Sequence, residues 1–237
     1  MPLEERRFDI HADLALRLGL GAAYTPLLYR DAEVQSVVEQ FDPYNDIPRD
    51  IANVKPHSEV AAQSFHVDGL LEPLGYLKTT MLQCRMQAAT GGGTQIFLAC
   101  RAFEDLIEAD PQAAAALAHP LALTRFSTIT PSTAKRLRDT GPSFGWVNGT
   151  LCTRFCDGPT EAWNLKLGAD LERGLRFIRS AQESSEYVEQ IHLKPGEVLI
   201  FRNDRVAHRG MKYSNGERSR HITRSMYLNA PTAVATK

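Results

Sequence analysis

Short apolar runs separated by tight turns fill the last third of the sequence. Residues 188–193 and 198–201 flank a Lys-Pro-Gly-Glu turn at 194–197, and residues 220–228 form a further run. Runs of this length that are bounded by Pro and Gly are typical of β-strands. The strands do not alternate regularly with helices, which disfavours a parallel α/β sheet. The sequence therefore predicts a mainly β fold with inserted helices and a double-sheet jelly-roll core of the cupin kind.

The first two thirds of the chain contribute both helices and strands, judged by periodicity and residue preference. The expected helices are two short ones within residues 12–40, through 14–20 and 34–41, and longer ones at 102–117 and 161–181. The expected strands are 76–87, 94–99 and 121–129, with a loop-rich β segment at 140–160. Prolines interrupt residues 42–58, where we expect an irregular connection. We expect one domain over 1–237, with N-terminal helices and a loop at 1–58 and the jelly-roll core with its helical insert at 59–230.

Composition excludes several classes of partner. The 27 basic and 28 acidic residues give a formal charge of -1, so the chain offers no basic field for a nucleic-acid backbone. No apolar run approaches the roughly 18 residues of a membrane span, and the start lacks the apolar segment of a signal peptide. We therefore expect a cytoplasmic protein with a small-molecule substrate and neither a nucleic-acid nor a membrane partner.

Four cysteines are scattered along the chain: Cys84, Cys100, Cys152 and Cys156. The spacing of Cys152 and Cys156 would suit half of a zinc site, but no matching second half exists. Without a secretory signal, scattered cysteines indicate reduced thiols rather than a disulfide framework. We expect ordinary, partly buried thiols.

Metal-ligand chemistry is suggested by His66-Val67-Asp68 in the first third and His208 near the end. Two imidazoles and one carboxylate form the facial triad that holds Fe(II) and leaves positions open for substrates and oxygen. In a strand, residues i and i+2 point to the same face, so His66 and Asp68 could reach one ion. A His-x-Asp sequence alone arises often by chance. The later His208, in a β-rich segment, makes oxidation chemistry the leading hypothesis.

Arginines follow His208 closely. Arg220 and Arg224 would face the same side of one strand because their numbers differ by an even count. A guanidinium there can bind a carboxylate through two parallel hydrogen bonds. The pattern suits a dicarboxylate cosubstrate.

At this point the sequence resembles the taurine dioxygenase and clavaminate synthase-like (TauD/TfdA) family. The resemblance runs from about residue 60 to 228 and is carried, in order, by His66-Val67-Asp68, residues 91–94 (Gly-Gly-Gly-Thr), residues 196–201 (Gly-Glu-Val-Leu-Ile-Phe), Asn203-Asp204, His208 and residues 220–224 (Arg-His-Ile-Thr-Arg). Members of that family are Fe(II)- and 2-oxoglutarate-dependent oxygenases built on a double-stranded β-helix. We take that fold and that activity as expectations for this chain.

The resemblance also implies roles for individual residues. His66, Asp68 and His208 would be the iron ligands and the catalytic centre. Arg224 would bind the distal carboxylate of 2-oxoglutarate, Arg220 would support the same anion, and Thr94 would hydrogen-bond it. The glycines at 91–93 are read as permitting a tight hairpin.

The reaction implied by the resemblance consumes 2-oxoglutarate and O2, releases succinate and CO2, and hydroxylates, desaturates or cyclises at an unactivated C–H bond. Related halogenases replace the carboxylate ligand with a small residue, so Asp68 disfavours halogenation. The expected substrate is a small polar metabolite such as an amino acid or a nucleotide-like compound. Two alternatives stay open: a cupin-like metalloenzyme that does not use 2-oxoglutarate, and a jelly-roll binding protein that has lost catalysis.

Substrate contacts are the least determined part of the site. Arg154 has a charge that would suit a carboxylate or phosphate, and Tyr76, Trp146 and Asn148 are further candidates, although packing or turn roles are common for such residues. The chain is shorter than many members of the family, mainly in the N-terminal part and the insert, where lids and oligomer contacts are commonly built. The oligomeric state therefore stays open, a homodimer included.

Overall fold

A four-stranded antiparallel sheet forms one layer of the protein. The computed structural model describes residues 10–27, 39–41, 59–126, 138–158, 161–215 and 220–232. The order of this sheet is β1-β15-β3-β12. Its strands are β1 (Glu39–Phe41), β15 (His221–Tyr227), β3 (Thr79–Met86) and β12 (Val198–Arg202). β3 is buried along most of its length, as expected of a strand covered on both faces.

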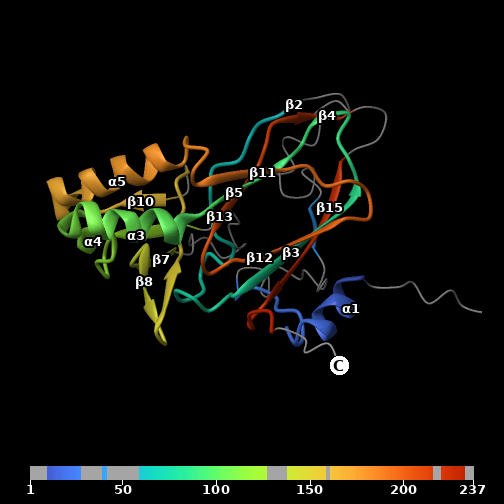
Figure 1. Ribbon diagram of the computed structural model, residues 1–237, viewed down its shortest axis with the longest axis horizontal. Helices are drawn as coiled ribbons and strands as arrows, with labels where there is room; N and C mark the ends of the chain where they lie inside the picture. Colours follow the sequence, from blue (N-terminus) through green and yellow to red (C-terminus); the bar gives the residue numbers. More distant parts are fainter. Residues whose placement is uncertain are drawn as a thin grey trace, which may run out of the picture.

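A second layer faces this sheet (Figure 1). It has the order β11-β5-β13 and is continued by three short strands in the order β2-β14-β4. These elements are β11 (Val188–Ile191), β5 (Thr94–Phe97), β13 (Ala207–Gly210), β2 (Glu59–Val60), β14 (Tyr213–Ser214) and β4 (Thr90–Gly91). Both layers contribute to one apolar cluster, in which Leu82, Phe201 and Ile222 meet Ile96. The two sheets and the core between them confirm the expected jelly roll.

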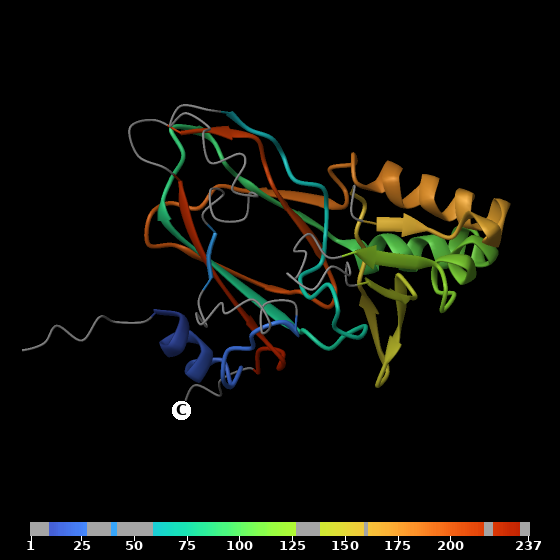
Figure 2. The same cartoon turned by 180° about the vertical axis from the view of Figure 1, so that it is seen from behind.

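The chain between β5 and β11 builds a separate layer of helices and short strands at one end of the molecule (Figures 1 and 2). In chain order it holds α3 (Ala99–Ala109), α4 (Pro111–Leu117), β6 (Leu123–Phe126), β7 (Arg138–Gly141), β8 (Phe144–Val147), β9 (Thr150–Thr153), β10 (Glu161–Trp163), η2 (Leu165–Leu167) and α5 (Ala169–Ala181). Its core stacks Phe103 on Phe144 with ring centroids 4.3 Å apart. We call this segment, residues 99–181, the insert.

Helix α1 (Ile10–Arg17) covers the outer face of the four-stranded sheet, at the end away from the insert (Figure 2). Ala15 packs against Met81 and Tyr227. His11 is 1 % exposed, and its ring nitrogens lie 2.6 Å from the Ser225 hydroxyl and 3.1 Å from the Thr223 hydroxyl. Because Thr223 and Ser225 face α1, the alternate residue Arg224 points to the opposite face, between the two sheets.

Most expected strands are confirmed, but the helices of the insert differ from expectation. The predicted helix at 102–117 is two helices, because Asp110 accepts a hydrogen bond from the Ala113 backbone N–H and Pro111 opens α4 at a position where no N–H is needed. The predicted helix at 161–181 begins only at Ala169. Residues 161–163 pair with β6 as strand β10 instead.

The N-terminal expectations fall partly outside the described residues. The first short helix is confirmed as α1. Of the second, expected through 34–41, residues 34–38 lie outside the described residues, and Glu39–Phe41 pair with β15 as a strand instead of forming a helix. The irregular connection at 42–58 and residues 127–129 of the strand predicted at 121–129 also lie outside the described residues.

No helix within the described ranges is long and apolar enough to cross a membrane. The four cysteines are buried and form no disulfide, as expected of reduced thiols.

Candidate metal centre and active site

His66 and His208 meet at an antiparallel bridge between two segments that are far apart in the sequence. The His66 N–H donates to the His208 carbonyl at 3.0 Å, and the His208 N–H donates back at 2.8 Å. With Asp68, they bring one ligand atom each to within 4.8 Å of one another, the only such cluster among the described residues. The fold therefore brings together the triplet that the sequence singled out.

A backbone hydrogen bond orients the His66 imidazole. Nδ1 of His66 lies 2.9 Å from the Ser64 carbonyl oxygen, which can only accept, so Nδ1 donates and Nε2 is the ring nitrogen left for a metal ion. Nε2 of His208 faces Asp68 Oδ2 at 3.8 Å. Two imidazole nitrogens and one carboxylate are a donor set that fits Fe(II).

Asp68 is held as an anion by its neighbours. Thr80 donates its hydroxyl to Oδ2 at 2.8 Å, and Nη1 of Arg224 donates to Oδ1 at 2.6 Å. Burial raises the pKa of the Asp68 carboxyl, but Arg224 and the two imidazoles outweigh it and leave the pKa well below its ordinary value. The carboxylate is therefore ionised at neutral pH, as metal binding requires.

His208 is held neutral by the same surroundings. Burial, followed by the proximity of His66, lowers the pKa of His208 to about 3. A neutral imidazole has a lone pair for a metal ion, so His208 does not have to lose a proton near neutral pH before it can bind one.

Asn203 fixes the backbone of Asp68 from the turn before β13. Its Oδ1 accepts the Asp68 backbone N–H at 3.0 Å, and its Nδ2 donates to the carbonyl oxygens of Asp68 and Leu77 at 3.3 Å and 3.2 Å. In the sequence Asn203 is marked only as part of the Asn203-Asp204 pair of the family resemblance, because local spacing does not indicate a partner on another segment. The neighbouring Asp204 accepts two short hydrogen bonds from Arg202.

The two arginines near the C-terminus occupy different places. Arg224 bonds the Asp68 carboxylate directly, whereas Arg220 lies with its guanidinium carbon 5.2 Å from the centroid of the Tyr213 ring. Gly92 makes room for it, since an added Cβ would lie 3.1 Å from Arg220 Nε. Burial lowers the pKa of Arg220 from its ordinary value. Thr94, two residues after Gly92, is buried at the start of β5.

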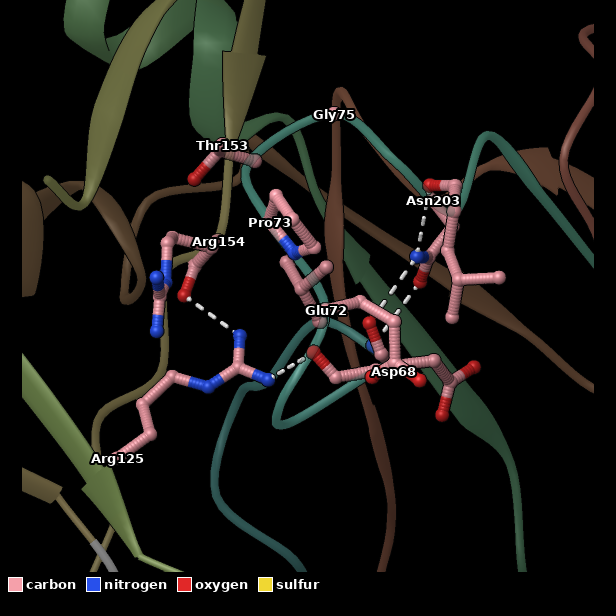
Figure 3. A pocket seen from close by; sticks show the side chains of 11 residues that line it. Asp68, Glu72, Pro73, Gly75, Arg125, Thr153, Arg154 and Asn203 are labelled. Atoms are coloured by element: carbon pink, nitrogen blue, oxygen red, sulfur yellow. Dashed lines mark hydrogen bonds between the residues drawn. The ribbon is translucent and has the colours of Figure 1, made fainter. Parts of the chain in front are cut away.

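A cavity lies beside Asp68, between the jelly roll and the insert (Figure 3). Asp68, Glu72 and Asn203 line it from the jelly-roll side, and Arg125 and Arg154 line it from the insert. Arg154 was expected near the substrate from its sequence position, whereas Arg125 was not singled out.

The other expected substrate contacts lie away from this cavity. Trp146 is 65 % exposed on the β8–β9 hairpin, and Asn148 takes a positive φ of 50° in the turn of that hairpin. Tyr76 is 43 % exposed and packs edge-on against Tyr24. None of the three is among the residues that line the cavity beside Asp68.

Comparison with known proteins gives a consistent result. The family described as "Taurine catabolism dioxygenase TauD, TfdA family" matches residues 7–226. The chain is 40 % identical over 227 residues to a uridine-5'-phosphate dioxygenase from Amycolatopsis sp, covering 94 % of this chain and 80 % of that protein. A uridine-5'-phosphate dioxygenase from Streptomyces sp is 36 % identical over 219 residues, covering 90 % of this chain and 76 % of that protein.

Solved structures with the same fold are more distant in sequence. An asparagine oxygenase in complex with Fe(II), hydroxyasparagine and succinate superimposes with a TM-score of 0.61 at 17 % identity, over 92 % of this chain and 63 % of that one. The non-heme iron oxygenase OrfP in complex with Fe and alpha-ketoglutaric acid gives a TM-score of 0.60 at 14 % identity, over 96 % of this chain and 69 % of that one. The chain thus spans less than two thirds of the asparagine oxygenase.

Proposed function

We propose, on the premise that the chain belongs to the taurine catabolism dioxygenase TauD, TfdA family, that its substrate is a nucleoside 5'-phosphate such as uridine 5'-phosphate. Within that family the chain is an Fe(II)- and 2-oxoglutarate-dependent dioxygenase. The single observation that carries the substrate assignment is the 40 % identity to a uridine-5'-phosphate dioxygenase over nearly the whole chain. The likeness to oxygenases of amino acids rests on less than 20 % identity and speaks for the fold alone.

His66, Asp68 and His208 would hold the iron. Their convergence, the protonated Nδ1 of His66 and the ionised Asp68 support this assignment. When bound, Fe(II) and 2-oxoglutarate would supply electrons that activate O2 for attack on an unactivated C–H bond, with release of succinate and CO2. The protein's own part is to aim the three donors at one point and to position the substrate beside them.

Arg220 suits the distal carboxylate of 2-oxoglutarate better than Arg224 does. The two carboxylates of 2-oxoglutarate lie at opposite ends of the molecule, so a cosubstrate that chelates the metal at one end needs its second cation several ångströms away. Arg224 bonds Asp68 itself. Arg220 precedes Arg224 by four residues, which is about 13 Å along an extended chain. Arg220 also lies beside Gly92, near Thr94, which would hydrogen-bond the same anion. Arg224 would then hold Asp68 and the metal end of the site.

One oxygenase domain over residues 1–237 is supported by the way the site is assembled. His66 and Asp68 precede the insert, and His208 follows it. The Asp204 carbonyl accepts the Thr153 backbone N–H at 2.8 Å, which ties the insert to the jelly roll next to the metal ligands. Buried thiols without disulfides are compatible with a cytoplasmic location.

The proposed function is tested by measuring the binding of cosubstrate and substrate and then the release of succinate. Under anaerobic conditions, Fe(II) and then 2-oxoglutarate should give the protein a weak visible charge-transfer band. Uridine 5'-phosphate should shift that band, and admission of O2 should release succinate in proportion to substrate consumed. Asp68→Ala should abolish both responses. Succinate release that is stimulated by free asparagine or arginine, but not by the nucleotide, would overturn the substrate assignment. Iron binding without the band would favour a metalloenzyme that does not use 2-oxoglutarate.

A further inference from the structure

Arg220 is a buried cation whose charge is not balanced by a carboxylate. The residue is 9 % exposed, and burial lowers its pKa from the ordinary value. Among the residues that the structure describes, no carboxylate forms an ion pair with Arg220, and the acidic groups that offset its burial are the Tyr213 phenol and the Cys84 thiol. Phenols and thiols are ordinarily uncharged at neutral pH. A buried guanidinium in such surroundings favours the binding of an anion.

The Arg220 side chain lies against an aromatic ring and a glycine. Its guanidinium carbon is 5.2 Å from the centroid of the Tyr213 ring, and Tyr213 is itself only 6 % exposed. An added Cβ at Gly92 would lie 3.1 Å from Arg220 Nε and 3.2 Å from Arg220 Cδ. A cation within about 6 Å of a ring centroid is attracted by the ring, most strongly where water is excluded. The ring and the missing Cβ thus both determine where the guanidinium lies.

The segment that supplies the ring also holds the backbone of Arg220. Asn215, two residues after Tyr213, is 4 % exposed, and its Oδ1 accepts the Arg220 N–H at 2.9 Å. Tyr213 itself, on β14, pairs with Val60 of β2 on one side and with Gly91 of β4 on the other, at the end of the second layer away from the insert (Figure 1). The position of the ring is therefore fixed by two neighbouring strands. We call Tyr213, Asn215 and Gly92 the cradle of Arg220.

A continuous ladder of backbone pairs joins the cradle to the candidate metal centre. Gly210, two residues after His208, pairs with Thr94 in the β13–β5 ladder. Further along the same two segments, the Gly92 N–H donates to the carbonyl oxygen of the residue before Tyr213 at 3.2 Å. A cosubstrate that binds the metal beside His208 and extends past Thr94 would therefore run toward the cradle.

We propose that Tyr213 is a positioning residue for the cosubstrate: its ring holds the Arg220 guanidinium where the distal carboxylate of 2-oxoglutarate binds. The proposal rests on the proposed function, in which Arg220 binds that carboxylate. The ring attracts the cation without supplying a negative charge, so it orients Arg220 and leaves the charge to be balanced by the anion. A carboxylate in the place of the ring would instead neutralise Arg220 and compete with the cosubstrate.

Two substitutions of Tyr213 test the proposal. Fe(II) affinity is measured by anaerobic calorimetry, and 2-oxoglutarate affinity by titration of the charge-transfer band of the Fe(II)-loaded protein. Tyr213→Leu should raise the dissociation constant of 2-oxoglutarate by about 3- to 30-fold and leave that of Fe(II) unchanged. Tyr213→Phe keeps the ring and should raise the 2-oxoglutarate constant by less than about threefold.

Three results of these titrations would overturn the proposal. The first is an unchanged 2-oxoglutarate constant in Tyr213→Leu. The second is an equal loss of Fe(II) and 2-oxoglutarate affinity in that variant, which a merely structural role would produce. The third is an equal loss of 2-oxoglutarate affinity in Tyr213→Phe and Tyr213→Leu, because the effect would then belong to the hydroxyl and not to the ring.

Tyr187→Leu is the matched control. Tyr187 also lies under an arginine, since the guanidinium carbon of Arg101 on α3 is 5.9 Å from the centroid of its ring. Its replacement should alter neither dissociation constant. A raised 2-oxoglutarate constant in Tyr187→Leu would mean that losing any such contact lowers the affinity, and the specific role of Tyr213 would fall.

Gly92→Ala tests the cradle without changing Tyr213. Gly92 has a φ of 78° and Gly149 a φ of 75°, so alanine is similarly strained at both positions. An added Cβ at Gly149 would have nothing within 4 Å, whereas one at Gly92 would meet Arg220. Gly92→Ala should therefore raise the 2-oxoglutarate constant, and Gly149→Ala should not. Equal constants in the two variants would contradict the cradle.

Failure of the proposal can be separated from failure of the proposed function. If the wild-type protein binds 2-oxoglutarate, and the affinity is lost in Arg220→Gln but kept in Tyr213→Leu, the positioning role alone is overturned. If the affinity is kept in Arg220→Gln as well, the assignment of the distal carboxylate to Arg220 is wrong. A wild-type protein that binds Fe(II) but gives no band with 2-oxoglutarate would overturn the proposed function, and the positioning role with it.

Discussion

The side-chain amide of Asn203 hydrogen-bonds the backbone of Asp68 on both sides, accepting its N–H and donating to its carbonyl oxygen. Asn203 is fully buried, and its partner lies 135 positions earlier in the chain. The turn that leads into the His208 strand therefore also fixes the segment that carries His66 and Asp68. One side chain couples the two halves of the candidate metal centre.

Replacing Asn203 by Ala should weaken Fe(II) binding by about 10- to 100-fold, a typical cost of losing a group that orients a metal ligand. It also leaves the buried Asp68 backbone N–H without an acceptor, at a cost to stability of about 1–3 kcal/mol. Anaerobic Fe(II) titration and thermal unfolding measure the two effects. Asn164→Ala, which removes a capping amide from η2 in the insert, should leave Fe(II) affinity unaltered. Unchanged Fe(II) affinity in Asn203→Ala would show that the backbone of Asp68 is positioned without the amide.

Thr79 and Thr80 are neighbours on β3 whose hydroxyls face opposite ways. Thr80 donates to Asp68 Oδ2 at 2.8 Å, while Thr79 donates to the Asn229 carbonyl oxygen at 2.7 Å. Thr80→Val should lower Fe(II) affinity by roughly tenfold, because a hydrogen bond to a charged group contributes about 1.5–3 kcal/mol and part of that is recovered when the metal binds. Thr79→Val should lower only the melting temperature. Equal effects of the two changes on Fe(II) affinity would contradict the role given to Thr80.

The cluster of His66, Asp68 and His208 could be predicted from the sequence, and its supporting residues could not. His66 and Asp68 are close in sequence, and a β-rich segment carries His208, so residue type and strand geometry sufficed. The partners of Asn203 and Arg125 are backbone groups on distant segments, and no local pattern marks them. Both residues could equally have been turn or surface positions, and only the folded chain brings them to those backbone groups.

The division between α3 and α4 is a different case, because its signal was present in the sequence. Asp110-Pro111 is a capping residue followed by proline at the first helical position, a combination typical of a helix start. The apolar periodicity of 102–117 continues across this point and favoured a single helix. The start of α5 was predicted too early for a related reason: the three residues of β10 are too few to register as a strand until β6 pairs with them.

Replacing Arg220 and Arg224 by glutamine, one at a time, should separate the effect on 2-oxoglutarate affinity from the effect on Fe(II) affinity. Arg220→Gln should raise the dissociation constant of 2-oxoglutarate by about 10- to 100-fold while Fe(II) binds nearly as in the wild type. Arg224→Gln should weaken Fe(II) binding as well, because Asp68 then loses the cation that keeps its carboxylate ionised and oriented. The charge-transfer band, titrated with each component in turn, reports both constants. Loss of 2-oxoglutarate affinity alone in Arg224→Gln would return the distal carboxylate to Arg224.

Gly174 lies where α5 packs against α4. At this position we expect glycine to be more stable than alanine, the reverse of the usual helix preference. Alanine is normally favoured over glycine inside a helix by up to about 1 kcal/mol. Here an added Cβ would lie 2.9 Å from the Ala113 carbonyl oxygen and 3.0 Å from the Leu117 side chain, so the two helices would have to separate. Gly174→Ala should therefore destabilise the protein by about 1–3 kcal/mol, a loss of roughly 3–10 °C in melting temperature for a chain of this size. Ser180→Ala, at an exposed position of the same helix, should change stability by less than about 0.5 kcal/mol. A melting temperature that rises in Gly174→Ala would mean that helix preference, rather than the close approach of α4 and α5, governs this position.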